Sequence, residues 1–565
     1  MSAVTDHTAI RGQVDLEPGT GDPVRSSEGG ARIARLQRGL RELSEGELAQ
    51  RQLANSMNVP GKEDGTTGCV KSLYLSVYFD GTGNNRDAEL DKPEGDRALS
   101  NIARLYESHQ TIDEHRGLWR EYIAGVGTPC AQVGDNGGVR GLALGAGGGE
   151  RNAHALKVLD DLVDSQPSSM SILVVTVSVF GFSRGAVSAR AFARDLAERC
   201  KPSEDGRWIY RDRVPLRISF MGVFDTVCSV WPAFTSAAIN FRSGHNGWAK
   251  GMRIPAMVEQ SVHMTAAHEL RGQFSLDSTR DHDAYPDNTV EIWFPGVHSD
   301  IGGGYDPRHQ GRRNSIARFS LNEMYEMARV GGVLLKPVDE LAPFLKSEFD
   351  KNDVELQAVF NGYLEAMPIK RGRFEDLQAA HMALLHRWLR VRTERGDLVP
   401  SMERLAERQA ELEAEIRTLR SQRKPQRNAI ADEGGQRNAD NAPASSSTME
   451  VMLEEREDEL KTVRKQMRGL RKQNDTLATK IERMRRKRGR GERLTLAEST
   501  MVDAWDDQTP LPTDVETFFD GYAHDSAAHW MLSDQTKWRV VHFGDTKYSP
   551  GSVMTRTDVV ENSSV

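Results

Sequence analysis

Five short apolar runs, each followed by a loop rich in glycine and polar residues, constrain the fold of this chain more than any other feature. The runs cover residues 73–79, 122–126, 172–180, 216–224 and 290–297. Helical stretches lie between them, and apolar strands that alternate with helices are typical of a parallel sheet covered on both faces. The sequence therefore predicts an α/β fold whose loops gather at the carboxyl ends of the strands, where open sheets of this kind bind ligands.

Two segments with heptad spacing follow this region. The repeats occupy positions 402, 405, 409, 412, 416 and 419, and positions 460, 463, 467, 470, 474, 477, 481 and 484. Nearly all of these residues are apolar, as in a coiled coil, and Asn474 occupies an a position. Residues 426–448 are rich in Asn, Gly, Ala and Ser and are interpreted as a loop. We therefore expect a long antiparallel helical (coiled-coil) hairpin inserted into the α/β fold, with arms of roughly 30–50 Å.

Charge is strongly segregated along the 565 residues. The chain has 74 Lys and Arg against 82 Asp and Glu, a net charge of −8, yet residues 461–493 hold 14 basic and 3 acidic residues. This segment carries +11, and the rest of the chain therefore carries −19. A basic arm is attracted to anionic lipid surfaces. It has no interleaved aromatic residues for stacking on bases, which, with the net acidity, argues against a nucleic-acid partner.

Composition divides the chain into four parts. Residues 1–68 are poor in aromatic residues and are expected to form a flexible N-terminal arm with one helix, over 31–55. Residues 69–371 hold the predicted catalytic domain, with an α/β-hydrolase-like, mostly parallel sheet. Residues 372–493 hold the helical hairpin insertion, and 494–565 a C-terminal part that closes the catalytic domain.

Several classes of protein and site are excluded. No apolar run approaches the ~18 residues of a membrane-spanning helix, and the first residues lack the apolar core of a secretory signal peptide. The four cysteines lie far apart without a CxxC pair, which argues against a disulfide framework and against a cysteine zinc site. We expect neither a metal nor a cofactor.

The strongest chemical signal is the sequence GFSRG at residues 181–185. It has the G-x-S-x-G form, with an apolar strand before it and a helix after it, which is the context of a nucleophile elbow. Glycines beside the serine permit the close backbone approach that the turn needs. Ser183 is therefore the candidate nucleophile, and the dipole of the following helix favours an anionic intermediate.

A serine nucleophile needs a histidine base and an acid that orients the base, in the chain order serine, acid, histidine. Asp225 directly follows the next strand, and His298 follows a later one. Both are therefore expected at the edge of the sheet that carries Ser183. His524 is the rival base, and it would pair with Asp225 or with Asp300.

The oxyanion hole is expected to combine the backbone N–H of Arg184 with one from the loop that contains Gly81 and Thr82. Residues 134–149, which hold eight glycines, match neither a dinucleotide-binding fingerprint nor a P-loop. We interpret them as a mobile loop at the rim of the site.

Five motifs in order resemble one known family. They are YFDGTGNN at 78–85, GFSRGA at 181–186, GVFDTV at 222–227, FPGVHSDIGGGY at 294–305 and YAHDS at 522–526. Together they resemble the catalytic domain of type VI secretion phospholipase effectors of the first lipase-effector class. The resemblance implies an α/β-hydrolase domain that cleaves phospholipid acyl esters, with the family's serine on Ser183 and its acid and base motifs on Asp225 and His298. His524 falls in a further family motif, whose role the resemblance does not fix.

The resemblance also implies where the protein acts and with what. It would be made in the cytoplasm and delivered by a contractile secretion system, without a signal peptide, to the periplasm or membrane surface of rival bacteria. Its partners would be a phospholipid membrane substrate, a cognate immunity protein and a spike, adaptor or chaperone protein. The N-terminal arm and the long hairpin depart from this pattern.

Two other functions fit the same residues. The site would serve equally well in a serine esterase that acts on another class of ester. Alternatively, the α/β domain is a scaffold, and the hairpin binds a chaperone, a spike protein or nucleic acid.

Overall fold

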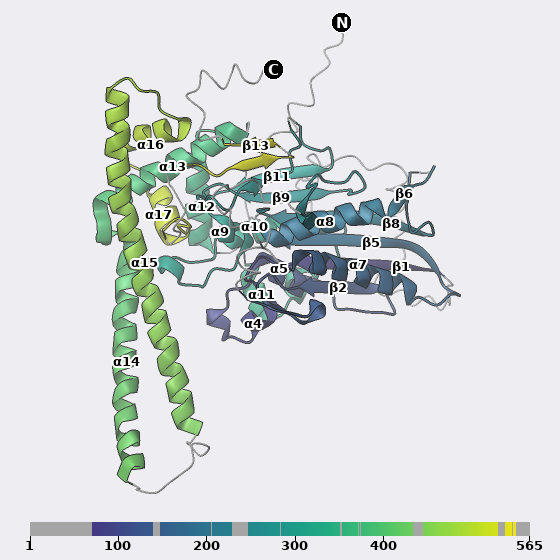
Figure 1. Ribbon diagram of the computed structural model, residues 1–565, viewed down its shortest axis with the longest axis horizontal. Coiled ribbons are helices and arrows are strands. Elements are labelled where there is room, and N and C mark those ends of the chain that lie inside the picture. The colour runs from purple at the N-terminus through teal and green to yellow at the C-terminus, as the bar shows by residue number, and fades with distance from the viewer. Residues whose placement is uncertain are drawn as a thin grey trace.

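The computed structural model describes residues 70–138, 147–204, 206–228, 247–282, 284–350, 353–370, 372, 374–432, 444–528, 537–544 and 546–549. The predicted N-terminal arm, including the helix expected over 31–55, lies outside these residues, as do residues 139–146 of the glycine-rich segment. Figure 1 shows an α/β body with a long helical hairpin along one side.

Six parallel strands form the main sheet, in the order β11-β9-β8-β5-β1-β2. They are β1 (Val70–Phe79), β2 (Leu118–Ile123), β5 (Ser171–Phe182), β8 (Val214–Phe224), β9 (Ser261–Ala266) and β11 (Thr289–Phe294). Two short strands extend the sheet: β7 (Trp208–Tyr210) pairs antiparallel with β8, and β6 (Cys200–Pro202) pairs with β7. The central strands β5 and β8 are buried along nearly their whole length, as expected for a parallel sheet with both faces covered. The predicted α/β fold is confirmed.

Strand β9 is the one long strand of the main sheet that no apolar run overlaps, and the run at 122–126 overlaps β2 only at Tyr122 and Ile123. The sequence of β9, SVHMTA, alternates apolar with polar residues, yet Ser261, His263 and Thr265 are all fully buried. Nδ1 of His263 lies 2.9 Å from the carboxylate of Glu291 on β11. A buried polar network therefore forms on one face of this strand, while Val262 and Met264 join the hydrophobic core from the other face, so the strand has no continuous apolar run.

Two pairs of helices pack on the main sheet. Helix α7 (Gly148–Asp164) packs against α8 (Arg184–Glu198), and α5 (Asn101–Ser108) packs against α10 (Ala317–Val330). Buried residues of these helices join those of the strands in one hydrophobic core. Shorter elements of the body are α4 (Arg86–Leu90), α9 (His298–Gly302), α11 (Pro343–Glu348), and the strand pair β3 (Pro129–Cys130) and β4 (Asp135–Asn136).

A second hydrophobic core lies on the side of the body that faces the hairpin (Figure 1). It is built by α12 (Val354–Ala366), α13 (Phe374–Arg395), α16 (Leu496–Asp506) and α17 (Thr513–Gly521). Tyr363, Trp388 and Phe518 are buried aromatic members. Because α13 packs against α16 and α17, residues 374–395 belong to this core rather than to a projecting arm.

The hairpin consists of α14 (Pro400–Asp432) and α15 (Ala444–Gly489) (Figure 1). Heptad residues of both arms, among them Leu405, Leu412 and Leu460, are buried in one cluster, so the predicted hairpin is confirmed. Both helices extend into residues 426–448, where the sequence predicts a loop. With 46 residues, α15 is about 69 Å long, which exceeds the expected arm length. In the described part of the chain, no helix is long and apolar enough to cross a membrane.

Acidic residues from neighbouring segments neutralise part of the positive charge on α15. The ion pairs are Arg464–Glu413, Arg471–Asp397, Arg485–Asp506, Lys487–Glu498 and Arg488–Asp503. Each of these acids lies outside residues 461–493. The separation of charge along the sequence is therefore larger than the separation of charge in space.

Residues 537–543 form a strand only at their end. Val541–Phe543 make β12, which pairs with β10 (Leu276–Asp277) and β13 (Thr546–Tyr548) in a separate small sheet. The residues before β12 instead bring Arg539 to the carboxyl end of β8, where its guanidinium binds Asp225.

The heptad packing predicts a measurable loss of stability on truncation. Leu412→Ala should lower the free energy of unfolding by about 2–5 kcal/mol, because Leu412 is fully buried and its removal leaves a cavity. Leu398→Ala, at a position that is 76% exposed, is the matched control and should change this free energy by less than about 0.5 kcal/mol. Urea unfolding followed by circular dichroism measures both, and equal losses would contradict the packing.

Candidate active site

The turn that carries Ser183 joins β5 to α8. Ser183 has φ 58° and ψ −123°, a region that non-glycine residues rarely occupy and that a strained strand-to-helix elbow requires. A Cβ on Gly185 would lie 2.3 Å from the carbonyl oxygen of Phe79, and one on Gly181 would lie 2.4 Å from that of Gly185. Only glycine fits at these two positions, so the motif follows from the close packing of the elbow.

Backbone hydrogen bonds place Asp225 next to this elbow. The N–H of Ser183 donates to the carbonyl oxygen of Phe224 at 3.0 Å, and the N–H of Val227 donates to that of Ser183 at 3.4 Å. Asp225 directly follows β8, with φ 39°, and is fully buried. The parallel register of β5 and β8 therefore sets the carboxylate beside the serine.

His298 is the first residue of α9, and its ring contacts Asp225. Nδ1 of His298 lies 2.5 Å from Oδ2 of Asp225, and the ring of Phe182, the residue before Ser183, packs 4.6 Å from the imidazole between centroids. Burial lowers the pKa of His298, and the hydrogen bond to Asp225 opposes this only in part. The imidazole is therefore neutral at pH 7, with Nδ1 donating to Asp225 and Nε2 left as an acceptor.

A cation far along the chain, Arg539, also binds Asp225. Its two terminal nitrogens lie 2.7 and 2.8 Å from the carboxylate oxygens, and the N–H of Ala266 donates to Oδ1 at 2.9 Å. Burial would raise the pKa of Asp225, but the charge of Arg539 and the hydrogen bond from His298 bring it below its usual range. The carboxylate therefore stays ionised although it is fully buried.

Residues that follow β9 enclose the other side of His298. Glu269 accepts a hydrogen bond from the backbone N–H of His298 at 3.2 Å, and Phe274 packs edge-on against the imidazole at 4.9 Å between centroids. Burial opposes ionisation of Glu269, but the adjacent Arg271 guanidinium lowers the pKa of Glu269 to about 2. The backbone and the ring of His298 are thus both held in place.

The loop after β1 is anchored by Asp80. Its carboxylate accepts hydrogen bonds from the hydroxyls of Ser100 and Tyr122, at 2.8 and 2.6 Å, and from the N–H of Gly81 at 2.7 Å. Burial raises the pKa of Asp80 to about 6 in spite of these bonds. The loop is therefore fixed from within the body.

The predicted oxyanion-hole residues lie together at the elbow. A Cβ on Gly81 would lie 2.4 Å from the ring of Phe182, so the loop packs directly against the residue before Ser183. The hydroxyl of Thr82 is buried and has no hydrogen-bond partner among the described residues. Arg184 begins α8, and burial lowers the pKa of its guanidinium to about 10.

His524 pairs with Asp300, one of the two acids that the sequence offers it. Its Nδ1 lies 2.6 Å from Oδ1 of Asp300, and both side chains are fully buried. Its ring stacks on Tyr305 at 4.0 Å between centroids. Nε2 of His524 is buried and has no hydrogen-bond partner among the described residues, so it does not bind the hydroxyl of Ser183.

Comparison with known proteins identifies the region around these residues. Residues 74–200 and 203–327 match a family described as the catalytic domain of Tle1-like type VI secretion phospholipase effectors. This region is a Tle1-like catalytic domain. It includes Ser183, Asp225 and His298, and it ends before His524 and Arg539.

Solved structures resemble the Tle1-like domain and the rest of the chain to different extents. A protein from Pseudomonas aeruginosa, described as uncharacterized, is 21% identical, with 93% of this chain and 84% of that chain covered; its TM-score of 0.64 shows a common fold. A Tle1 effector bound to the VgrG spike of the type 6 secretion system is 19% identical over 52% of this chain and 79% of that chain, with a TM-score of 0.37. No curated protein matches the sequence.

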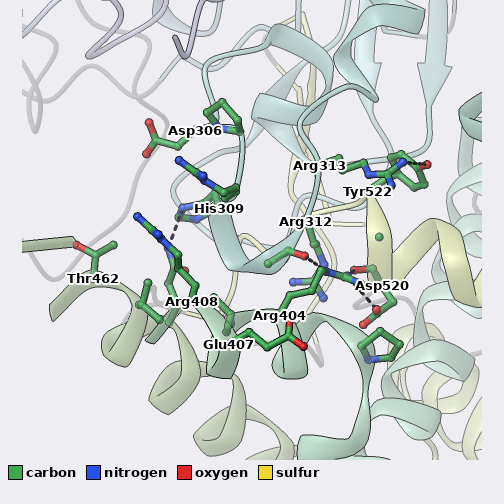
Figure 2. Close-up of a pocket in the computed structure, with 18 of the residues that line it drawn as sticks. Asp306, His309, Arg312, Arg313, Arg404, Glu407, Arg408, Thr462, Asp520 and Tyr522 are labelled. Atoms are coloured by element: carbon green, nitrogen blue, oxygen red, sulfur yellow. Dashed lines mark hydrogen bonds and ion pairs between the residues drawn. The ribbon is translucent and has the colours of Figure 1, made fainter. Parts of the chain in front are cut away.

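A cavity of 1110 Å³ lies between the Tle1-like domain and the hairpin. Figure 2 shows part of its wall, where Arg404 reaches toward Asp520 and Arg408 lies near His309. Its charges are largely paired, as in the contacts of Arg404 with Asp520 at 3.2 Å and of Arg408 with Glu459 at 2.8 Å. None of the residues described around Ser183 lines this cavity, so it is separate from the candidate active site.

Two residues that contact the Asp225–His298 pair, Glu269 and Arg539, are not part of any motif in the sequence. Glu269 follows the unpredicted strand β9, and no motif marks it. Arg539 lies in the apolar segment WRVVHF, where a lone basic residue is itself a signal, because a charged side chain is rarely buried unless it is paired. That signal predicts a buried ion pair without naming the acid.

Removing Arg539 should destabilise the Tle1-like domain and change the ionisation of its site. Arg539→Gln leaves Asp225 buried without its strongest counter-charge, so the free energy of unfolding should fall by about 3–5 kcal/mol. The more basic carboxylate should also raise the pKa of His298, and any activity that needs neutral His298 should then fail at a higher pH.

Urea unfolding and a pH–activity profile measure these two effects. Lys201→Gln, which breaks a surface ion pair with Asp212, is the control and should change stability by less than about 1 kcal/mol. If Arg539→Gln lowers the free energy of unfolding no more than Lys201→Gln does, the buried ion pair does not stabilise the domain.

Proposed function

We propose that the Tle1-like domain is a serine phospholipase that hydrolyses acyl esters of membrane phospholipids through a covalent acyl-enzyme. The observation that carries the proposal is the contact of 2.5 Å between His298 and Asp225 beside the Ser183 elbow. The three residues follow β5, β8 and β11, in the order serine, acid, base. Similarity to a phospholipase effector family supports phospholipid esters as the substrate class.

The first half of the reaction transfers the acyl group to Ser183. Nε2 of His298 takes the proton of the serine hydroxyl as the oxygen attacks the ester carbonyl carbon. Asp225 holds the Nδ1 proton and stabilises the imidazolium that forms. The backbone N–H of Arg184 and one from the loop at Gly81 and Thr82 donate to the carbonyl oxygen as it gains negative charge.

Collapse of the tetrahedral intermediate breaks the ester bond and leaves the acyl group on Ser183. His298 gives its proton to the departing alcohol oxygen of the lysophospholipid. A water molecule then attacks the acyl-enzyme and gives a proton to His298; as the bond to Ser183 breaks, His298 returns this proton to the serine oxygen and the fatty acid is released.

His298 is the base in this proposal, in preference to His524. His298 contacts Asp225, the residue after the Phe224 carbonyl that binds the N–H of Ser183, and its ring packs on Phe182. His524 instead pairs with Asp300. The free nitrogen of His524 makes no hydrogen bond to any described residue. A base must reach the hydroxyl it deprotonates, and the geometry of His298 supports that contact best.

The family also supports an antibacterial use of the enzyme. We propose delivery by type VI secretion machinery to the periplasm or membrane surface of a target bacterium, carried by a spike, adaptor or chaperone protein. Because the substrate also forms the membranes of the producing cell, a cognate immunity protein is the expected protection there.

Ser183→Ala should abolish fatty-acid release from phospholipid vesicles. Loss of the nucleophile should reduce kcat by at least about 10⁴-fold, because no acyl-enzyme forms. Ser188→Ala, which removes a buried hydroxyl in the same helix, is the matched control and should retain activity. Free fatty acid released from vesicles gives the readout.

A short soluble ester assayed in parallel separates the substrate classes. Activity of the unaltered protein on the soluble ester but not on vesicles would replace the phospholipase by an esterase of another class. Full activity of Ser183→Ala on both substrates would reject the serine mechanism.

The pH dependence of kcat/KM should report His298. The base works only when neutral, so activity should be lost as the pH falls through the pKa of His298. Burial lowers that pKa, and the acid limb should therefore lie below the ordinary histidine value of about 6.5. A profile from about pH 4 to about pH 8 on a soluble ester tests this; an acid limb at or above about 6.5 would contradict a buried base.

A further inference from the structure

We infer that Asp300 and His524 act as a positioning pair, which holds the helix that begins with His298 so that the imidazole stays aligned with Ser183. This inference rests on the proposed function, because it assigns His298 as the base. It gives a role to the motif around His524, which the proposed reaction leaves unused.

The first contact fixes the backbone on the N-terminal side of His298. Oδ2 of Asp300 accepts a hydrogen bond from the N–H of Val297 at 3.0 Å. Asp300 lies two residues after His298 in α9, so its side chain turns back over the start of its own helix. A Cβ on Gly296 would lie 2.7 Å from Cβ of Asp300, which shows how closely this turn is packed.

A second carboxylate holds the next N–H in the chain. Glu269 accepts from the N–H of His298 at 3.2 Å, so two consecutive N–H groups at the start of α9 each donate to a buried carboxylate. These groups have no partner within a helix, and anchoring them fixes the position of the first turn. The imidazole of His298, whose Nδ1 is already held by Asp225, can then swing very little.

His524 in turn holds Asp300. Its backbone N–H donates to Oδ2 of Asp300 at 3.0 Å, and its Nδ1 contacts Oδ1 at 2.6 Å. Tyr305, three residues after the end of α9, stacks on the His524 ring at 4.0 Å between centroids. The carboxylate that caps α9 therefore has no alternative orientation in which it keeps its partners.

The segment that carries His524 is itself fixed by the helical part of the protein. Asp525 forms an ion pair with Arg392 of α13 at 2.6 Å and accepts a hydrogen bond from Gln473 of α15 at 3.1 Å. The N–H of Asp525 donates to the side chain of Gln310 at 2.9 Å. A chain of buried contacts thus runs from the hairpin through His524 and Asp300 to the backbone beside His298.

Two substitutions of His524 separate positioning from other roles. His524→Leu removes the Nδ1 donor, whereas His524→Asn places an amide N–H near the same point and keeps the bond to Asp300. His524→Leu should lower kcat on a soluble ester by about 10–100-fold with little change in KM, since a misplacement of the base by about 1 Å has an effect of this size. His524→Asn should restore most of the activity, and His115→Leu, at an exposed site, should have none of these effects.

The pH profile gives a readout that a purely structural role would not move. A looser Asp225–His298 contact removes the interaction that raises the pKa of His298, so the acid limb of kcat/KM for His524→Leu should shift to lower pH. The fraction of Ser183 that reacts with a fluorophosphonate at saturation measures how much of each variant is folded and competent. All rates are divided by this fraction.

Three results would overturn the inference. Unchanged kcat and an unchanged pH profile in His524→Leu would show that His298 needs no such support. Loss of labelled fraction with a normal rate per labelled site would show a role in folding alone. Activity of both variants as low as that of Ser183→Ala would make His524 the base itself. Failure of the proposed function looks different, because Ser183 of the unaltered protein would then not be labelled at all.

Discussion

The buried carboxylate of Asp225 is the group on which the rest of the site depends. A charge that has left water needs compensating partners, and Ala266 at the end of β9, His298 at the start of α9 and Arg539 before β12 supply them. Each partner comes from a different element, so one side chain ties the main sheet to the segment after the hairpin. Because the carboxylate remains ionised, it also keeps the proton of His298 on Nδ1. One contact therefore serves both the packing of the domain and the tautomer of the proposed base.

The features that could be predicted from the sequence are those that leave a pattern among neighbouring residues. Apolar runs predict the strands at 172–180 and 216–224, and the flanking glycines predict the elbow at Ser183. The sheet and the position of Asp225 beside the elbow could therefore be predicted. Strand β9 could not be predicted in this way, because the polar residues of a buried network that includes His263 and Glu291 interrupt its apolar residues. The ion pair of Arg539 with Asp225 could not be predicted for another reason. It joins residues more than 300 positions apart, and no periodicity relates them.

The two histidines that the sequence left as rivals each have an aspartate of their own. His298 with Asp225 and His524 with Asp300 are chemically alike, fully buried and bound through Nδ1. What separates them is their surroundings, since Phe182 of the elbow packs on the first and Tyr305 on the second. Spacing and residue type describe both pairs equally well, and the packing of the neighbouring ring is what supports His298 as the proposed base.

Arg539 follows the hairpin in the chain, and this has a consequence for biosynthesis. As the protein leaves the ribosome, the elbow, Asp225 and His298 all emerge before the two long helices, whereas the cation that neutralises Asp225 emerges after them. Until then the carboxylate cannot be buried in its final, ionised state without a large electrostatic penalty. The nascent chain therefore holds every proposed catalytic group well before it can assemble them, and an incomplete chain that ends within the hairpin would lack a finished site.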